Sequence, residues 1–211
     1  MGEDIDHNGA LNQTIQAALP KGTQVHDKDF FDLTSNPEIM AVVARDGLTL
    51  SGTAPAFTVH PPISSEVPSG PFDFILLATQ PTQIEEAAGQ SLDALAEDGA
   101  MVVLANGLCE QRVAAVCGEH RVFGGIVSFG ATAGAPGHVE RTSSGGITIG
   151  RLDGKDDPRL NVLAATLSSV GPVLVTHNLQ GARFSKLALN CAVTGLGTIA
   201  GTHLGALLSD T

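Results

Sequence analysis

The chain contains 211 residues, and its 22 acidic residues outnumber 11 lysines and arginines to give a formal net charge of −11. This balance argues against a nucleic-acid partner, because phosphate groups would be repelled. The hydrophobic content of 43% can supply a core, and the length allows one domain and part of a second. No apolar run is long enough to span a bilayer and no signal peptide is evident. We therefore expect a cytoplasmic protein without a membrane partner.

Cysteine and histidine give no sign of a disulfide framework or a metal site. Cys109, Cys117 and Cys191 are odd in number and stand in helix-like or apolar contexts, which indicates reduced thiols. The seven histidines are scattered without ligand spacing. We therefore predict no bound metal.

The N-terminal part of the chain has little pattern. Residues 1–36 form a polar lead with three isolated glycines, none of which follows an apolar strand. Short strands are predicted next, at 48–51 and 57–60, before a loop rich in proline and serine.

Three apolar runs, at 72–80, 101–108 and 122–131, indicate strands of a parallel sheet, the first of them buried on both faces. Ligands of open α/β sheets bind beyond the carboxyl ends of the strands. The residues predicted at such ends are Thr79, Gln80, Asn106, Gly107 and Ala131. Each has a simpler explanation, since Asn-Gly is a common turn and Thr-Gln-Pro can begin a helix. Their joint placement favours a binding site.

Helices are predicted where apolar residues recur at helical spacing, at 83–97, 110–116, 157–170 and 178–200. Asp157-Pro158 and Asn178 supply helix starts for the last two. An antiparallel pair is predicted between 137–141 and 146–149, and a last strand at 172–177.

The most informative pair is Lys186 and Asn190. At a spacing of four residues they share one face of the predicted C-terminal helix, which is otherwise apolar and rich in small residues. An ammonium there is costly unless it reaches a cleft or a partner. Together the two groups suit a small substrate with a carbonyl and a carboxylate. The alternative is a solvent-facing lysine beside a surface asparagine.

These segments resemble the ketopantoate reductase (2-dehydropantoate 2-reductase) family. The resembling motifs are Leu104-Ala-Asn-Gly-Leu, Val122-Phe-Gly-Gly, Gly137-His-Val-Glu-Arg, Ile147-Thr-Ile-Gly and Lys186-Leu-Ala-Leu-Asn. The resemblance covers roughly residues 37–211, and the order and spacing of the motifs carry it.

The resemblance implies reduction of a 2-oxo acid to a 2-hydroxy acid with NADPH. Lys186 would be the general acid that protonates the developing alkoxide. The substrate-binding positions would be Asn190, Thr194 and Asn106. The cofactor-binding positions would be Thr79, Gln80, Asn106, Gly107 and Ala131.

The chain also departs from the family pattern. Residues 1–36 lack the Gly-x-Gly-x-x-Gly turn that cradles a pyrophosphate, and the acidic segment 27–36 lacks the basic residue by which the family selects the 2′-phosphate. Gln80 stands where the family usually has lysine, and Thr194 where it has asparagine. The later serine and glutamate of the family site have no counterpart before Thr211. We therefore expect weakened binding of NADPH.

The expected fold is α/β, an incomplete Rossmann-like dinucleotide-binding sheet followed by the start of an all-helical domain. The expected division is 1–36, 37–178 and 179–211. Two functions remain open, a 2-oxo acid reductase, whether fully active or impaired, and a non-catalytic remnant that binds a partner or nothing. The reductase would take a small 2-oxo acid and could form a homo-oligomer.

Overall fold

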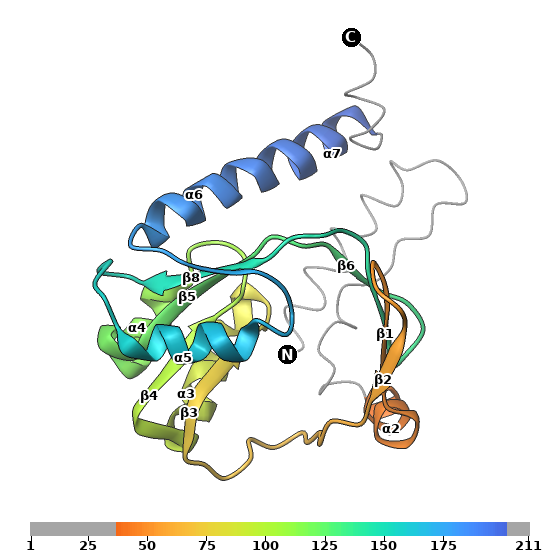
Figure 1. The fold of residues 1–211 in the computed structure, drawn as a ribbon, viewed down its shortest axis with the longest axis horizontal. Coiled ribbons are helices and arrows are strands. Elements are labelled where there is room, and N and C mark those ends of the chain that lie inside the picture. Colours follow the sequence, from red (N-terminus) through yellow and green to blue (C-terminus); the bar gives the residue numbers. More distant parts are fainter. Residues whose placement is uncertain (1–36, 202–211) are drawn as a thin grey trace, which may run out of the picture.

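The structure, a computed structural model, describes residues 37–201. This part of the chain contains two sheets, shorter helices beside them and a long C-terminal helix (Figure 1). The larger sheet has the strand order β3-β4-β5-β8-β9, and the smaller has the order β2-β1-β7-β6. Within residues 37–201, every helix is too short or too polar to cross a membrane.

The larger sheet forms the expected α/β core. Its strands are β3 (Phe72–Leu77), β4 (Leu95–Val103), β5 (Val122–Val127), β8 (Ile147–Arg151) and β9 (Val173–Val175). β3, β4 and β5 are parallel, whereas β8 runs antiparallel to β5 and parallel to β9. The predicted parallel sheet is therefore confirmed for the three strands whose carboxyl ends matter for binding.

Helices cover both faces of this sheet. On one face lie α3 (Ile84–Ser91) and α4 (Glu110–Cys117), which pack on Met101 and Val103 of β4. On the other lies α5 (Pro158–Leu167), which packs on Ala100 and Val102. Because successive side chains of a strand point to opposite faces, the continuous apolar run of β4 contributes buried side chains to the hydrophobic cores on both faces of the sheet.

β3 departs from the prediction that it is buried on both faces. Only Leu77 at its end is buried, whereas Phe72 and Leu76 are 38% and 44% exposed. The reason is position, since among the described residues β3 pairs only with β4 and is an edge strand.

The helix predicted at 83–97 is too long. α3 ends at Ser91, a 3₁₀ turn follows at Leu92–Ala94, and β4 begins at Leu95. The Leu95 side chain is buried in the core, and the Arg121 guanidinium donates hydrogen bonds to the carbonyls of Leu95 and Ala96. These tertiary contacts favour the extended conformation over a continued helix.

The strand pairing of the smaller sheet overturns a second prediction. The strands of this sheet are β1 (Leu48–Gly52), β2 (Phe57–Val59), β6 (Ala131–Ala133) and β7 (His138–Arg141). The helix α2 (Pro37–Asp46) leads into β1. The predicted antiparallel pair at 137–141 and 146–149 does not form. β7 pairs with β1 and β6, while β8 pairs with β5 and β9. The segment between them crosses from one sheet to the other, which local alternation cannot reveal.

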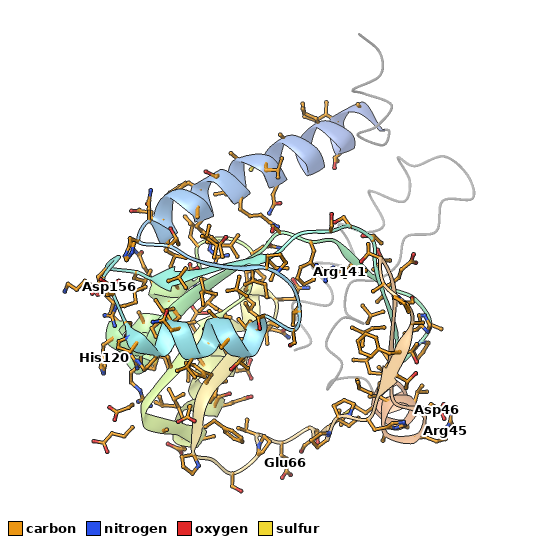
Figure 2. The ribbon with its side chains drawn as sticks, viewed as in Figure 1. Arg45, Asp46, Glu66, His120, Arg141 and Asp156 are labelled. Atoms are coloured by element: carbon orange, nitrogen blue, oxygen red, sulfur yellow. The ribbon has the colours of Figure 1, made fainter. Side chains whose placement is uncertain are left out.

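Arg141 connects the two sheets and lies between them in Figure 2. From the end of β7 its guanidinium donates to the carbonyls of Val170 and Gly145, at 2.7 and 2.8 Å. It also stacks over the Phe129 ring, 4.3 Å from the centroid. One side chain thus ties the smaller sheet to the loops beside α5 and β8.

The two predicted helix starts are confirmed. The Asp157 side chain accepts a hydrogen bond from the Arg159 amide at the start of α5, and that of Asn178 accepts from the Gly181 amide. Asn178 begins the C-terminal helix, which comprises α6 (Leu179–Asn190), a π-helical turn (Cys191–Gly195) and α7 (Leu196–Ala200). The division into domains at 178 stays a prediction.

Candidate functional site

The carboxyl ends of three neighbouring strands meet at one edge of the larger sheet. Thr79 follows β3, Asn106 and Gly107 follow β4, and Val127 is the last residue of β5. Leu77 is paired with Val103, so β3 and β4 end level, whereas Val103 is paired with Gly124 and β5 continues from there to Val127. The structure therefore brings residues from separate motifs to the same end of the parallel strands.

Lys186 reaches this edge from α6. Its Nζ atom donates a hydrogen bond to the carbonyl oxygen of Val127 at 2.6 Å, and its side chain is half-buried. Asn190 lies one turn further along α6 and is also half-buried. Lys186 is therefore not a free surface lysine, and its ammonium is held at the end of β5.

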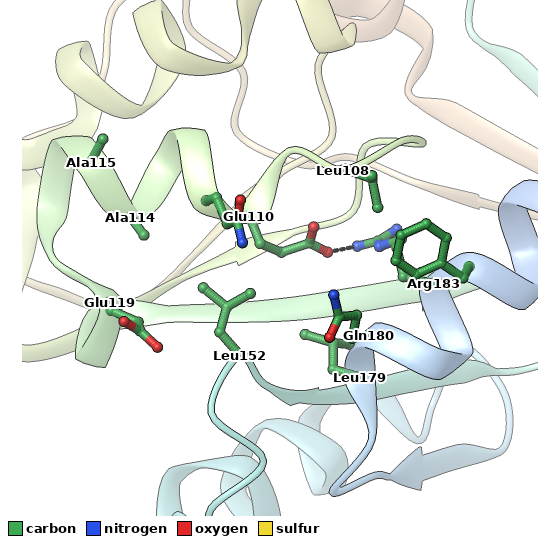
Figure 3. Close-up of a pocket in the computed structure, with 11 residues that line it drawn as sticks. Leu108, Glu110, Ala114, Ala115, Glu119, Leu152, Leu179, Gln180 and Arg183 are labelled. Carbon is green, nitrogen blue, oxygen red and sulfur yellow. Dashed lines mark hydrogen bonds and ion pairs between the residues drawn. The ribbon is translucent and has the colours of Figure 1, made fainter.

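A buried ion pair that sequence reasoning missed lies one turn before Lys186. Arg183 and Glu110 are 3% and 4% exposed and form a direct ion pair (Figure 3). The Arg183 guanidinium also donates to the carbonyls of Ala105 at 3.1 Å and Val103 at 3.2 Å, and makes a longer contact to Gly125. The sequence did offer a signal for this ion pair. Arg183 stands on the face of the helix that packs against the sheet, and a buried charge there needs a partner.

Close packing of α6 on the sheet depends on small residues beneath it. Leu179 at the start of α6 lies over Gly124 of β5, where an added Cβ would come within 2.5 Å of the leucine and 2.9 Å of Glu110. A side chain at position 124 would therefore push α6 and α4 away from the sheet. The helix that carries Lys186 is positioned by this contact and by Arg183.

A groove of about 590 Å³ lies between α4 and α6 (Figure 3). Its lining mixes polar and apolar side chains, with Arg183 and Glu110 at one side, and the remaining lining includes Leu108, Gln111, Glu119, Leu152 and Phe184. It contains none of the residues predicted to bind substrate or cofactor. The candidate site is therefore the edge of the sheet, and the groove lies on the α4 face beside it.

The other predicted residues are placed less centrally. Gln80 is exposed before the 3₁₀ turn Pro81–Gln83 and makes no capping bond to it. Ala131 is exposed and opens β6 of the smaller sheet, four positions beyond the end of β5. Thr194 falls in the π-helical turn, and its side chain lies outside the described part of the structure.

Two local features fit the nicotinamide half of a dinucleotide. The Thr79 hydroxyl oxygen is buried without a hydrogen-bond partner, so it has free capacity toward a ligand. Gly107 has a φ of 90°, and the space beyond it is open, which lets a ligand approach the backbone. A pyrophosphate cradle is not found among residues 37–201, so the fit extends to this half only.

The thiol nearest the edge does not supply a nucleophile. Cys109 is buried, and its Sγ atom donates to the carbonyl of Asn106 at 3.5 Å. Burial raises the pKa of this thiol, which keeps it protonated near neutral pH. Residues 37–201 also contain no cluster of three or more histidine, cysteine, aspartate or glutamate side chains that could hold a metal ion.

The parallel strands, the helices on both faces and the edge with its lysine define a Rossmann-like α/β protein. Comparison with known families makes this more specific. The family model described as Ketopantoate reductase PanE/ApbA matches residues 9–154, and the chain belongs to this family. The match starts within residues 1–36, where we found no resembling motif.

Two curated relatives, both named 2-dehydropantoate 2-reductase, support this assignment. The one from Halobacterium salinarum is 37% identical over 117 residues, covering 53% of this chain and 38% of the relative. The one from Pyrococcus horikoshii is 25% identical over 167 residues, covering 78% of this chain and 54% of the relative. The chain thus spans about half the length of these relatives or less.

A solved structure supports the fold. The ternary structure of D-mandelate dehydrogenase with NADH and anilino(oxo)acetate superposes with a TM-score of 0.70 at 22% identity. The superposition covers 78% of this chain and 54% of that one. This likeness establishes the fold alone.

Proposed function

We propose that this chain carries the reductase site of a 2-oxo acid reductase and converts 2-dehydropantoate, or a similar 2-oxo acid, to the 2-hydroxy acid with NADPH. The observation that carries the proposal is the Lys186 ammonium, which is fixed on Val127 at the edge where Asn106 and Thr79 also lie. A proton donor in a fixed position is what reduction of a carbonyl requires, because the oxygen develops negative charge as the carbon accepts hydride.

Each residue has a defined task in this proposal. A bound nicotinamide would supply the hydride to the carbonyl carbon. Lys186 donates a proton to the carbonyl oxygen and offers positive charge to the substrate carboxylate. Asn190, one turn away, orients the substrate, and Asn106 bridges substrate and cofactor. The Thr79 hydroxyl, which has no hydrogen-bond partner in the structure, would contact the nicotinamide half.

The relatives support the choice of substrate class. Both curated relatives are named for 2-dehydropantoate, and the fold neighbour D-mandelate dehydrogenase was solved with anilino(oxo)acetate, which carries a carbonyl beside its carboxylate as 2-oxo acids do. That neighbour was solved with NADH, so NADPH and NADH both belong in any assay.

A second candidate is a non-catalytic remnant that binds a partner or nothing. The missing Gly-x-Gly-x-x-Gly turn favours it, because several charge-assisted bonds to the pyrophosphate would be lost. We therefore propose that any reductase activity of the 211-residue chain is impaired.

The test is turnover with a panel of 2-oxo acids. The purified chain is incubated with NADPH or NADH and each acid, and loss of reduced nicotinamide is followed with chromatographic identification of the 2-hydroxy acid. The reductase proposal predicts slow, enzyme-dependent formation of product with 2-dehydropantoate or a close analogue. No product with any acid or cofactor would favour the remnant.

A further inference from the structure

Among the described residues, the hydrogen bonds of Arg183 and its ion pair with Glu110 reach none of the residues assigned above to substrate or cofactor, yet the pair connects the elements that carry them. Arg183 lies three positions before Lys186 on α6, and Glu110 is the first residue of α4. We infer that this pair is a positioning device that holds Lys186 and the Asn106 turn in a fixed relation. The inference rests on the proposed function for its chemical meaning.

The guanidinium holds the Asn106 turn at both ends. On one side it donates to the carbonyl of Ala105, the residue immediately before Asn106, at 3.1 Å. On the other side it pairs with Glu110, where the turn enters α4. The planar fork of arginine can make these bonds at once in fixed directions, which a lysine cannot do. The loop with Asn106 and Gly107 is thus bracketed by a single side chain.

The same guanidinium fixes α6 to the strand that Lys186 contacts. Arg183 approaches the carbonyl of Gly125, and Lys186 donates to the carbonyl of Val127 two residues along β5. Arg183 and Lys186, one helical turn apart on α6, therefore contact carbonyls two residues apart on β5, which point in the same direction from the strand. Rotation or sliding of α6 that moved Lys186 would also have to break the buried contacts of Arg183.

Stability alone gives a weak reason for such a pair. Desolvation of two charges offsets most of their attraction, and apolar residues of similar size often replace a buried ion pair without loss of stability. A positioning role explains the geometry better, because the bonds are directional whereas apolar packing is not. The two explanations predict different behaviour when the pair is replaced by apolar residues.

The experiment measures whether Lys186 is held in place, in the full chain without any ligand. The chain contains four lysines, at 21, 28, 155 and 186. The rate of acetylation of Lys186 by sulfosuccinimidyl acetate is followed by mass spectrometry, with the exposed Lys155 as the internal reference. The main variant is Glu110→Leu/Arg183→Met. Its matched control is Glu85→Leu/Arg112→Met, which removes a partly exposed pair between α3 and α4.

We expect the acetylation rate of Lys186, relative to that of Lys155, to be about tenfold higher in the main variant than in the wild type. A tenfold change corresponds to the loss of about one hydrogen bond to a charged group. The control variant should leave the ratio unchanged. Buried Cys117 should stay unreactive toward a thiol reagent in both, which shows that the fold persists. An unchanged Lys186 rate in a folded main variant would overturn the inference.

Glu110→Gln gives a second measurement if the double variant unfolds. The amide still accepts a bond from Arg183 and only the charge is lost, so the Lys186 rate should rise about threefold. Unfolding of both variants would show that the pair serves the fold, which would also overturn the inference. Acetylation needs no cofactor, so the two proposals can fail separately. If the main variant raises the acetylation rate of Lys186 but the wild-type chain shows no turnover, the proposed function is contradicted and the positioning role stands.

Discussion

Lys186 and Val127 are separated by 59 positions in the sequence, yet the Lys186 ammonium donates a hydrogen bond of 2.6 Å to the Val127 carbonyl. This contact joins the C-terminal helix to the end of a central strand of the α/β sheet. The lysine is thereby presented at the edge where parallel strands of a Rossmann-like sheet expose their binding residues. Because the Lys186 side chain is already ordered by this bond, substrate binding does not bear the conformational-entropy cost of ordering it.

Cofactor affinity should be low in the isolated chain. Each charge-assisted bond to a pyrophosphate contributes about 1.5–3 kcal/mol, and the turn that would supply several of them is missing from the sequence. We expect a dissociation constant for NADPH in the high micromolar range or weaker, measured by calorimetry. The Halobacterium salinarum relative serves as the comparison. Low-micromolar binding would show that residues 1–36 build a cradle of another kind.

The outer edge of β3 should promote self-association. Its backbone has no partner strand within residues 37–201, and Leu76 on it is 44% exposed. Size-exclusion chromatography should show oligomers that Leu76→Lys reduces. The control is Val162→Lys, which adds the same charge to the exposed surface of α5. A wild-type monomer that persists at all concentrations would contradict this prediction.

Much of this architecture follows from local sequence. Runs of apolar residues and turn residues located β3, β4 and β5 and the polar residues at their ends, and Asp157 and Asn178 located two helix starts. These features depend on neighbours in the chain, where periodicity and capping act.

Other features depended on contacts between distant segments. The end of α3 at Ser91 and the assignment of β7 and β8 to different sheets are set by pairing partners. Glu110 looked like an ordinary acidic residue at a helix start, and only the approach of Arg183, 73 positions away, makes it a buried ion pair. Local patterns carry no information on such a pairing.

Thiol reactivity should separate one cysteine from the other two. Cys109 and Cys117 are buried, and burial raises the pKa of both thiols, so little thiolate is present at neutral pH. Cys191 is exposed. A colorimetric thiol reagent should show one fast-reacting group per native chain, and Cys191→Ser should abolish that phase. Two or more fast thiols in the native protein would contradict the described core.

Asp157 should stabilise the fold in a pH-dependent way. Its carboxylate caps α5 and pairs with Arg159 and Arg151, which hold its pKa well below the usual range. A lowered pKa in the folded state means that this stabilisation is complete above the unfolded pKa of about 4 and is lost as the pH falls further.

Asp157→Ala should therefore cost about 2 kcal/mol at pH 7 by chemical denaturation, through the lost cap and the lost ion pairs. The difference from wild type should shrink below about pH 4. The neighbouring Asp156→Ala serves as the control, because that side chain is 96% exposed. A cost for Asp157→Ala that does not change with pH would contradict the electrostatic explanation.

The central claim is that Lys186 donates the proton in a 2-oxo acid reductase site, and turnover of Lys186→Ala tests it most directly. With NADPH and 2-dehydropantoate, we expect kcat to fall by about 10²–10⁴-fold relative to the wild-type chain, since positioned acids contribute that much. Lys186→Arg should restore little, because a guanidinium stays protonated and differs in shape. Stability should fall by no more than about 1.5–3 kcal/mol, the scale of the lost bond from the ammonium to Val127. Wild-type turnover in Lys186→Ala, or a wild-type chain without any turnover, would contradict the claim.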